Sequence, residues 1–305
     1  MVYYHVWDNY PYPKFNKPAY LSNDYIACIS KVTHDIVTTV APEVPSSYVP
    51  HAVNENVFKK LPEEEVLKFR SHNLKDADKM IFFWNNRNAR RKQSGTLIWW
   101  FKEFLDKIGH DKAVLLMHTD PKDMNGQDLE HIIGELGLTN GEVMFSKEKI
   151  PPSHLAMMYN MADCTINIAD AEGFGLSTLE SLACETPIIV SMTGGLQEQV
   201  TDGENWFGVG IEPSSKAIIG SQEVPYIYED RLNKEDFINT LTQFYNLSSE
   251  ERAHMGHLGS LHVKENYNFS TFINQWENIL AEVYEACGSW ETRKNYQSYD
   301  FREIQ

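Results

Sequence analysis

The stretch that decides the fold is Glu172-Gly-Phe-Gly-Leu-Ser-Thr-Leu-Glu180, in which two carboxylates flank a short glycine-containing loop. Residues 165–169 before it are apolar and β-branched and indicate a buried strand, whereas residues 176–184 have helical spacing and end before Pro187. A strand, a glycine loop and a helix N-terminus together present backbone N–H groups and a positive dipole end, which suit a phosphate. A ligand along this loop would meet Glu172 at one end and Glu180 at the other. The pattern therefore favours a long, polyhydroxylated ligand with a central diphosphate, such as a nucleotide-sugar.

The same alternation of strand and helix signals extends over the middle of the chain. Short apolar runs at residues 80–84, 113–117, 143–145, 165–169 and 188–190 indicate strands, and helical patterns near residues 94–108, 127–137 and 153–162 separate the first four. Repeated βα units of this length predict an α/β fold with a Rossmann-like, doubly wound parallel sheet. Ligands of such sheets bind beyond the carboxyl ends of the strands, so the polar residues that follow these strands are the candidate site.

Composition narrows the classes of function. The chain has 305 residues and a net charge of −16, which argues against nucleic-acid binding because that function needs a basic face. No apolar run approaches the roughly 20 residues of a membrane-spanning helix, and the N-terminus lacks the pattern of a signal peptide. The cysteines, Cys28, Cys164, Cys184 and Cys287, lack metal or redox spacing. We therefore expect reduced thiols, a cytoplasmic location and no integral membrane segment.

A cationic loop follows the first strand of the predicted sheet. Arg87, Arg90, Arg91 and Lys92 fall within six residues of an otherwise acidic chain. At the end of a strand they can neutralise a diphosphate. The alternative, a solvated charge run at the start of a helix, is disfavoured by the helix dipole. Arg87 and Lys92 are the stronger candidates, and the sequence does not distinguish Arg90 from Arg91.

Other candidates at this edge carry weaker signals. Gly194-Gly195 is consistent with a plain turn or with a close backbone approach to a phosphate or sugar hydroxyl. His118 and His5 each follow a strand, but single histidines in such positions are more often structural. No set of His, Cys, Asp and Glu residues has metal-ligand spacing, so we expect no metal and no other cofactor.

Taken in order along the chain, these pieces resemble glycosyltransferase family 4, whose members are retaining enzymes with the GT-B fold. The matching segments are Arg87 with Lys92 five residues on, the glutamate motif at 172–180, Cys184-Glu-Thr-Pro187 and Gly194-Gly-Leu-Gln-Glu198. They fall within residues 81–268, where the resemblance implies the C-terminal, donor-binding domain. One departure is Glu185, which stands where the family usually has glycine.

The resemblance implies a role for the matching residues. Glu180 would accept hydrogen bonds from ribose hydroxyls, and Glu172 would contact the transferred sugar. Arg87 and Lys92 would stabilise the leaving diphosphate in place of a metal. His5 would touch the sugar from the opposite domain. The remaining predicted donor-binding residues are Gly173, Phe174, Gly175, Leu176, Ser177, Gly194, Gly195 and His118, with Ser146, Lys147 and Ile150 in the loop that would hold the base.

The resemblance also divides the chain. Residues 1–65 resemble a remnant of the N-terminal, acceptor-side GT-B domain, which in the family is normally preceded by many more residues. Residues 66–268 are predicted to form the nucleotide-sugar-binding domain, and residues 269–305 a C-terminal helix and tail that pack back on the N-terminal portion. Residues 212–232 have loop chemistry and no clear period, which is typical of a functional lid.

The predicted function is a retaining, metal-independent glycosyltransferase that moves a sugar from a UDP-, GDP- or ADP-linked donor to an unidentified glycan, lipid or protein. One alternative is a nucleotide-sugar-binding module that depends on an oligomer or a partner chain for the missing half. A second is a nucleotide-sugar epimerase of related fold. An epimerase needs acid and base groups on both faces of the sugar, for which His5, His118 and Glu172 are the candidates.

Overall fold

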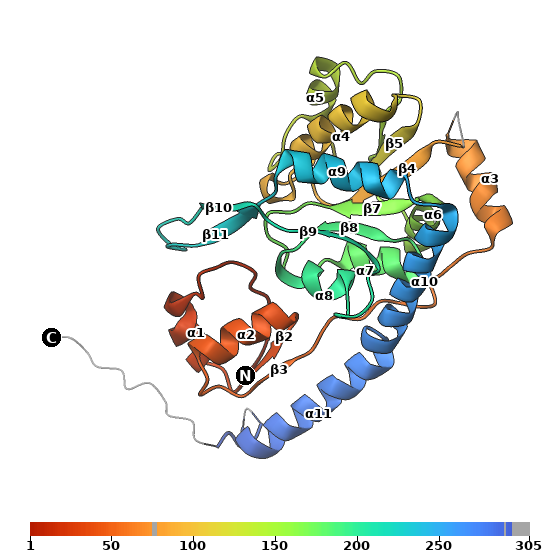
Figure 1. Ribbon diagram of the computed structural model, residues 1–305. Helices are drawn as coiled ribbons and strands as arrows, with labels where there is room; N and C mark the ends of the chain where they lie inside the picture. The colour runs from red at the N-terminus through yellow and green to blue at the C-terminus, as the bar shows by residue number, and fades with distance from the viewer. Residues whose placement is uncertain (75–77, 290, 295–305) are drawn as a thin grey trace.

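The computed structural model describes residues 1–74, 78–289 and 291–294, and its centre is a six-stranded parallel sheet (Figure 1). The strands are β4 (Met80–Asn85), β5 (Ala113–His118), β6 (Val143–Ser146), β7 (Cys164–Asn167), β8 (Ile188–Ser191) and β9 (Gly208–Ile211), in the order β6-β5-β4-β7-β8-β9. The chain winds outward from β4 to β6 and then returns to β7 on the other side of β4. This confirms the predicted doubly wound fold, and the reversal leaves a crevice beyond the carboxyl ends of β4 and β7.

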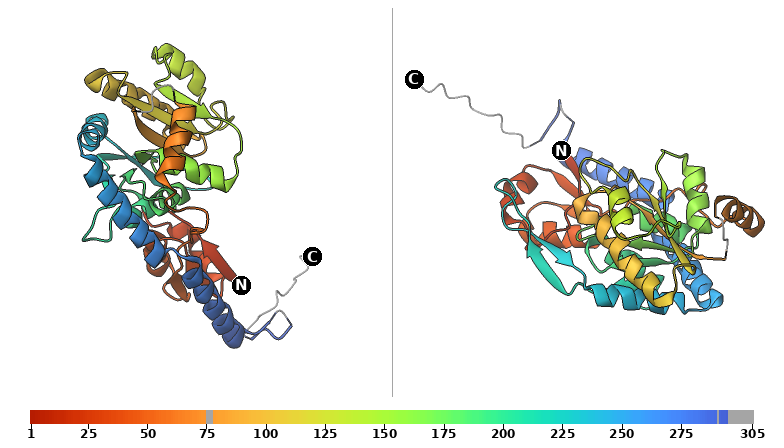
Figure 2. Two further views of the ribbon diagram at one scale, coloured as in Figure 1. Left: turned by 90° about the vertical axis from the view of Figure 1, so that its right-hand side faces the viewer. Right: turned by 90° about the horizontal axis from the view of Figure 1, so that it is seen from above.

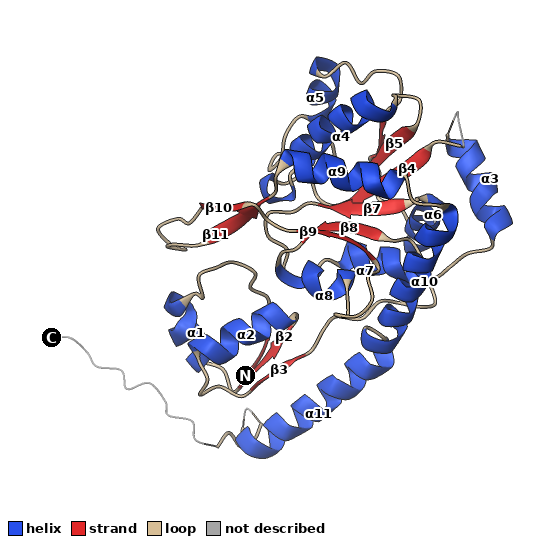
Figure 3. Ribbon diagram, viewed as in Figure 1, coloured by secondary structure: helices blue, strands red, loops and turns tan. Residues whose placement is uncertain are grey.

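Helices cover both faces of this sheet (Figure 3). On one face lie α4 (Ser94–Ile108), α5 (Leu129–Glu135) and α9 (Lys234–Tyr245), and Phe101, Phe104 and Phe244 surround Phe82 of β4. On the other face lie α6 (Pro152–Met161), α7 (Leu176–Ala183) and α10 (Ser249–Asn266), which pack on Phe83 and its neighbours. Because both faces are buried, β4 is a continuous apolar run rather than an alternating one.

The N-terminal portion has a small parallel sheet of its own. Its strands are β1 (Val2–His5), β2 (Tyr25–Cys28) and β3 (Ser46–Tyr48), in that order. Helices α1 (Lys17–Leu21) and α2 (Lys31–Val40) pack on one face. On the other face lies α11 (Phe269–Cys287), which places Ile279 against Ala27 and Val49 (Figure 2). Residues 290 and 295–305, part of the predicted C-terminal segment, lie outside the described residues.

A hairpin occupies the segment that the sequence predicts to be an irregular loop. Strands β10 (Ser215–Ile218) and β11 (Tyr228–Arg231) pair in antiparallel fashion. The backbone N–H of Tyr228 donates to the Tyr10 carbonyl, and the Asn9 side chain donates to the Tyr228 carbonyl at 2.9 Å. The hairpin therefore connects the six-stranded domain with the N-terminal portion. Its residues are mostly exposed or half-buried, so the sequence shows no apolar alternation there.

The turn after α7 shows how the chain tolerates glutamate in place of the family's glycine. Glu185 adopts a left-handed φ of 61°, a conformation that glycine favours. Helix α10 packs directly on this turn, and a Cβ at Gly256 of α10 would lie only 1.9 Å from the Glu185 carbonyl oxygen.

The shorter or peripheral elements are η1 (Lys14–Asn16), α3 (Glu63–Asn73), η2 (Arg90–Lys92), η3 (Gly194–Leu196) and α8 (Gln197–Val200).

Candidate functional site

Two cavities meet at the loop between β7 and α7, in the crevice beyond β4 and β7. The first has a volume of about 310 Å³, and its lining includes Asn85, Asn86, Lys92, Glu172, Ser177 and Glu180. The second has a volume of about 470 Å³ and lies between the same loop and residues 6–9 of the N-terminal portion. Glu172, Gly175 and Leu176 line both, so the glutamate motif forms the wall that the two cavities share.

A buried ion pair joins Lys92 and Glu172 at this wall. The Lys92 Nζ contacts Glu172 Oε2, and each residue is only 8% exposed. Asn167, at the end of β7, donates to the same carboxylate oxygen at 3.4 Å. Burial lowers the pKa of Lys92, and the neighbouring Glu172 carboxylate opposes this effect. The structure thus brings together a predicted phosphate-binding cation and the predicted sugar-binding carboxylate.

The glycines of the motif allow a tight loop under the N-terminal portion. A Cβ at Gly173 would lie 2.2 Å from a methyl group of Val6, and Gly175 begins α7 with a φ of 93°. Leu176 and Ser177 of the first helical turn line the first cavity, where the helix dipole favours negative charge. Phe174 is buried and lies against His51, with ring centroids 6.3 Å apart.

Gly194 and Gly195 pack on this loop. A Cβ at Gly194 would lie 1.9 Å from the Glu172 carbonyl oxygen, and one at Gly195 would lie 2.7 Å from Phe174 Cα. The Gly195 N–H donates to the Glu172 carbonyl at 2.9 Å. The two glycines therefore pack on the glutamate loop, and their predicted approach to a phosphate or a sugar hydroxyl stays a prediction.

Glu180 lies on α7 and lines the first cavity but not the second. Its Oε2 accepts a hydrogen bond of 2.9 Å from the Tyr159 hydroxyl. Burial raises the pKa of Glu180 to about 7, and the hydrogen bond from Tyr159 opposes this rise. A carboxylate held at a cavity wall can accept hydrogen bonds from two neighbouring hydroxyls of a ligand.

The four cations of the loop point in different directions. Arg87 is exposed and forms a two-point contact with Asp123, with its Nε 2.6 Å from Oδ2, so it does not join Lys92. Arg90 forms two hydrogen bonds of 2.7 Å to Glu229. Arg91 donates to the Ala171 carbonyl and lines the second cavity. Arg91 is therefore the arginine that lies beside Glu172, whereas Arg87 is paired with Asp123.

The residue that faces Glu172 from the N-terminal portion is Asp8. His5 is buried, its Nε2 lies 2.9 Å from the Tyr20 hydroxyl, and burial lowers its pKa to about 4. His5 thus lies in the core of its own sheet and is not among the residues that line the second cavity. Asp8 lines the second cavity, and its pKa is raised mainly by burial, with Arg91 and Lys92 opposing the rise.

His118 ends β5, and the predicted base-binding loop begins at the end of β6. His118 Nδ1 is 2.9 Å from Ser146 Oγ, and burial lowers the pKa of His118. Lys147 turns outward to pair with Glu130. Ser146 and Ile150 line a third cavity of about 510 Å³, between α3, α6 and the β5–β6 face. This cavity is the largest of the three, but its lining is mostly apolar and includes neither lysine nor arginine, which makes it unsuited to a diphosphate.

No group of three or more His, Cys, Asp or Glu side chains in residues 1–74, 78–289 and 291–294 is placed to hold a metal ion. No helix in the same residues is long and apolar enough to cross a membrane.

Solved structures with this architecture show that the fold is the GT-B fold. The sucrose-phosphate synthase tll1590 of Thermosynechococcus elongatus aligns with a TM-score of 0.70 and 22% identity, over 89% of this chain and 61% of its own. Anabaena Alr3699/HepE, solved in complex with UDP and glucose, aligns with a TM-score of 0.72 and 15% identity, over 92% of this chain and 71% of its own.

The chain belongs to the family described as glycosyl transferases group 1, whose sequence profile matches residues 65–257. A D-inositol 3-phosphate glycosyltransferase of Paenarthrobacter aurescens (strain TC1) is 32% identical over 130 residues, which are 42% of this chain and 30% of the relative. The enzyme of the same name from Acidothermus cellulolyticus is 39% identical over 90 residues, which are 29% of this chain and 20% of the relative. The matched region thus spans less than a third of either relative, and the resemblance to a glycosyltransferase family is confirmed.

Proposed function

We propose that this chain binds a nucleotide-diphosphate-sugar in the first cavity and is the donor-binding part of a retaining glycosyltransferase. One observation carries the proposal: a single cavity is bounded by the buried Lys92–Glu172 pair, the first turn of α7 and Glu180. The cation and the helix N-terminus suit a diphosphate, and the carboxylates at the two ends suit sugar and ribose hydroxyls.

Lys92 and Arg91 would supply the positive charge that the reaction requires. As the bond between the anomeric carbon and the phosphate oxygen breaks, its electron pair moves to the phosphate, where fixed cations stabilise it. The acceptor oxygen bonds to the same carbon, and its proton passes to the departing phosphate. Lys92 is buried beside the motif, and Arg91 lines the adjoining cavity. This arrangement supports transfer without a metal.

The positions of the carboxylates support retention by attack from the same face as the leaving group. Glycoside hydrolases use two carboxylates that flank one glycosidic bond. Glu180 lines only the first of the two cavities, whereas Glu172 lies at the wall between them, so the two are not placed as such a pair. We assign Asp8, which faces Glu172 across the second cavity, the hydroxyl contact predicted for His5.

The alternatives differ in their support. The epimerase alternative has little support, because its two candidate histidines already have partners: His5 is paired with Tyr20, and His118 is paired with Ser146. A binding module that needs a partner chain would have the same first cavity. It would differ from a transferase only because the chain alone would not turn over the donor. UDP-glucose is the first donor to test, because the fold neighbour HepE was solved with UDP-glucose.

The proposal is tested by donor binding followed by turnover. We expect one of UDP-, GDP- or ADP-glucose, with EDTA present, to raise the melting temperature, because saturation at 100 times Kd stabilises the native state by about 2.7 kcal/mol. Proton NMR at early times should then show donor breakdown with the α configuration kept in the product. Stabilisation without turnover would favour the binding module, a β product would refute retention, and no stabilisation by any donor would refute the proposal.

A further inference from the structure

A chain of hydrogen bonds links the end of β4 to Glu180 through a buried tyrosine. Asn85 is the last residue of β4, and its Nδ2 donates to the Tyr159 hydroxyl oxygen at 2.8 Å. The Tyr159 hydroxyl donates in turn to Glu180 Oε2 at 2.9 Å. These three residues come from β4, α6 and α7, which are separate in the sequence and adjacent around the first cavity.

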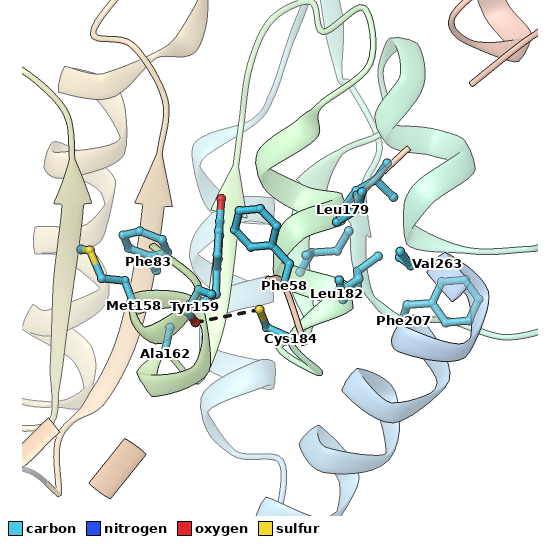
Figure 4. Close-up of a cluster of buried hydrophobic side chains, with 14 of the residues drawn as sticks. Phe58, Phe83, Met158, Tyr159, Ala162, Leu179, Leu182, Cys184, Phe207 and Val263 are labelled. Carbon is cyan, nitrogen blue, oxygen red and sulfur yellow. Dashed lines mark hydrogen bonds between the residues drawn. The ribbon is translucent and has the colours of Figure 1, made fainter. Parts of the chain in front are cut away.

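The tyrosine ring is fixed by packing. Tyr159 is fully buried, with its ring centroid 6.1 Å from that of Phe58 and 5.1 Å from that of Phe83, both in edge-on geometry. Figure 4 shows the ring between these two phenylalanines, with its hydroxyl pointing out of the hydrophobic cluster. The position of the hydroxyl is therefore set by the core and not by the ligand.

The direction of the hydrogen bonds is also fixed. An amide N–H only donates, so the Tyr159 oxygen accepts from Asn85 and its single O–H is left for Glu180. Burial raises the pKa of Tyr159 well above its usual value, so the phenol keeps its proton and remains a donor. When Glu180 is ionised, Asn85 therefore donates to the Tyr159 hydroxyl, and the Tyr159 hydroxyl donates to Glu180.

We propose that Tyr159 is a positioning residue that fixes one oxygen of the Glu180 carboxylate and leaves the other for the hydroxyls of a nucleotide ribose. The proposal rests on the function proposed above. It adds that nucleotide affinity depends on a hydroxyl group that does not itself touch the nucleotide.

The electrostatics of Glu180 give this role a measurable consequence. Burial raises the pKa of Glu180 to about 7, and the hydrogen bond from Tyr159 is the interaction that opposes the rise. Other titratable or charged groups lie on the surrounding elements. Lys92 and Glu172 line the same cavity as Glu180, and Cys184 follows Glu180 by about one helical turn. Lys60 lies near Cys184, and His257 of α10 contacts Glu185. Loss of the Tyr159 hydroxyl should therefore raise the pKa of Glu180.

Tyr159→Phe tests the proposal, with Tyr267→Phe as the matched control. Tyr267 is also buried, and its hydroxyl donates to the Glu198 carbonyl at 3.3 Å, away from Glu180. The side-chain carboxyl of Glu180 is titrated by NMR in ¹³C-glutamate-labelled, ligand-free protein, with Glu180→Gln to assign its signal. We expect Tyr159→Phe to raise the pKa of Glu180 by about one pH unit and to weaken UDP-glucose binding about tenfold at neutral pH, since one pH unit and a tenfold change in affinity each correspond to about 1.4 kcal/mol.

The two readouts separate the two proposals. If the wild-type protein binds no nucleotide, the proposed function fails, while the carboxyl titration still decides whether Tyr159 controls Glu180. An unchanged Glu180 pKa in Tyr159→Phe, or an equal shift in Tyr267→Phe, would overturn the positioning role. If Tyr159→Phe does not fold, Asn85→Ala takes its place, because it frees the Tyr159 hydroxyl from its orienting donor and should shift the pKa in the same direction.

Discussion

Replacement of Lys92 with methionine is expected to lower donor turnover by about 100- to 1,000-fold, the usual effect of removing a group that stabilises charge in the transition state. Lys92 is the cation that lines the first cavity together with Glu172 and Glu180. Methionine keeps the length and the packing of the side chain but removes its charge. Turnover of UDP-glucose, followed by release of UDP, measures the effect.

Stability must be separated from catalysis in this variant. Lys92→Met leaves Glu172 buried without its ion-pair partner, which costs about 3–5 kcal/mol of folding free energy in comparable cases. The double variant Lys92→Met/Glu172→Gln removes both charges and should recover much of this stability without recovering turnover. Lys102→Met is the matched control, because Lys102 forms only a surface pair with Asp106. A folded Lys92→Met protein with near wild-type turnover would contradict the role of Lys92.

Glu180→Ala is expected to weaken nucleotide-sugar binding by about 10- to 100-fold, because a hydrogen bond to a charged group contributes about 1.5–3 kcal/mol. The affinity should also depend on pH. The pKa of Glu180 is raised to about 7, and the ionised form is the better acceptor for ribose hydroxyls. Affinity should therefore rise as the pH increases through 7 and fall as Glu180 becomes protonated below it.

Calorimetry with UDP-glucose on both sides of pH 7 measures this dependence, because the diphosphate of this donor does not titrate there. Glu180→Gln removes the titrating group and is the control that should abolish the slope. If Glu180→Gln keeps the wild-type slope, the pH dependence belongs to another group. If Glu180→Ala binds with unchanged affinity, the ribose assignment is wrong.

Sequence patterns predicted the sheet because its physical signals are local. Each βα unit places a short apolar run before an amphipathic segment, and the shortness of a run such as β4 indicates a strand and not a helix. The glutamate motif also locates the site, because the carboxyl ends of β4 and β7 must meet at the switch point.

The directions of individual side chains could not be predicted in the same way. Residues 90–92 form a single 3₁₀ turn, and Gln93 follows with a left-handed φ of 56°, so no regular period tells which arginine faces the cavity. His5 ends β1 facing its own core, and the chain then turns and brings Asp8 to the cavity. An acidic residue just beyond a strand end was the only available signal for Asp8.

The hydrogen bond between Tyr159 and Glu180 could not be predicted from the sequence for a different reason. The two residues are 21 positions apart and lie on separate helices, α6 and α7, which pack side by side on one face of the sheet. Sequence patterns indicate that each helix is amphipathic but not how the two are rotated against each other. The hydrogen bond depends on that rotation, which core packing around Phe58 and Phe83 determines.

The proposed function requires that the first cavity holds the diphosphate and the ribose of a sugar donor, and a crystal structure of the chain with UDP-glucose would show whether it does. We expect the diphosphate to lie between Lys92 and the first turn of α7, the ribose hydroxyls to contact Glu180, and the glucose to point toward Glu172. A nucleotide that leaves both Lys92 and Glu180 without a contact would contradict this arrangement.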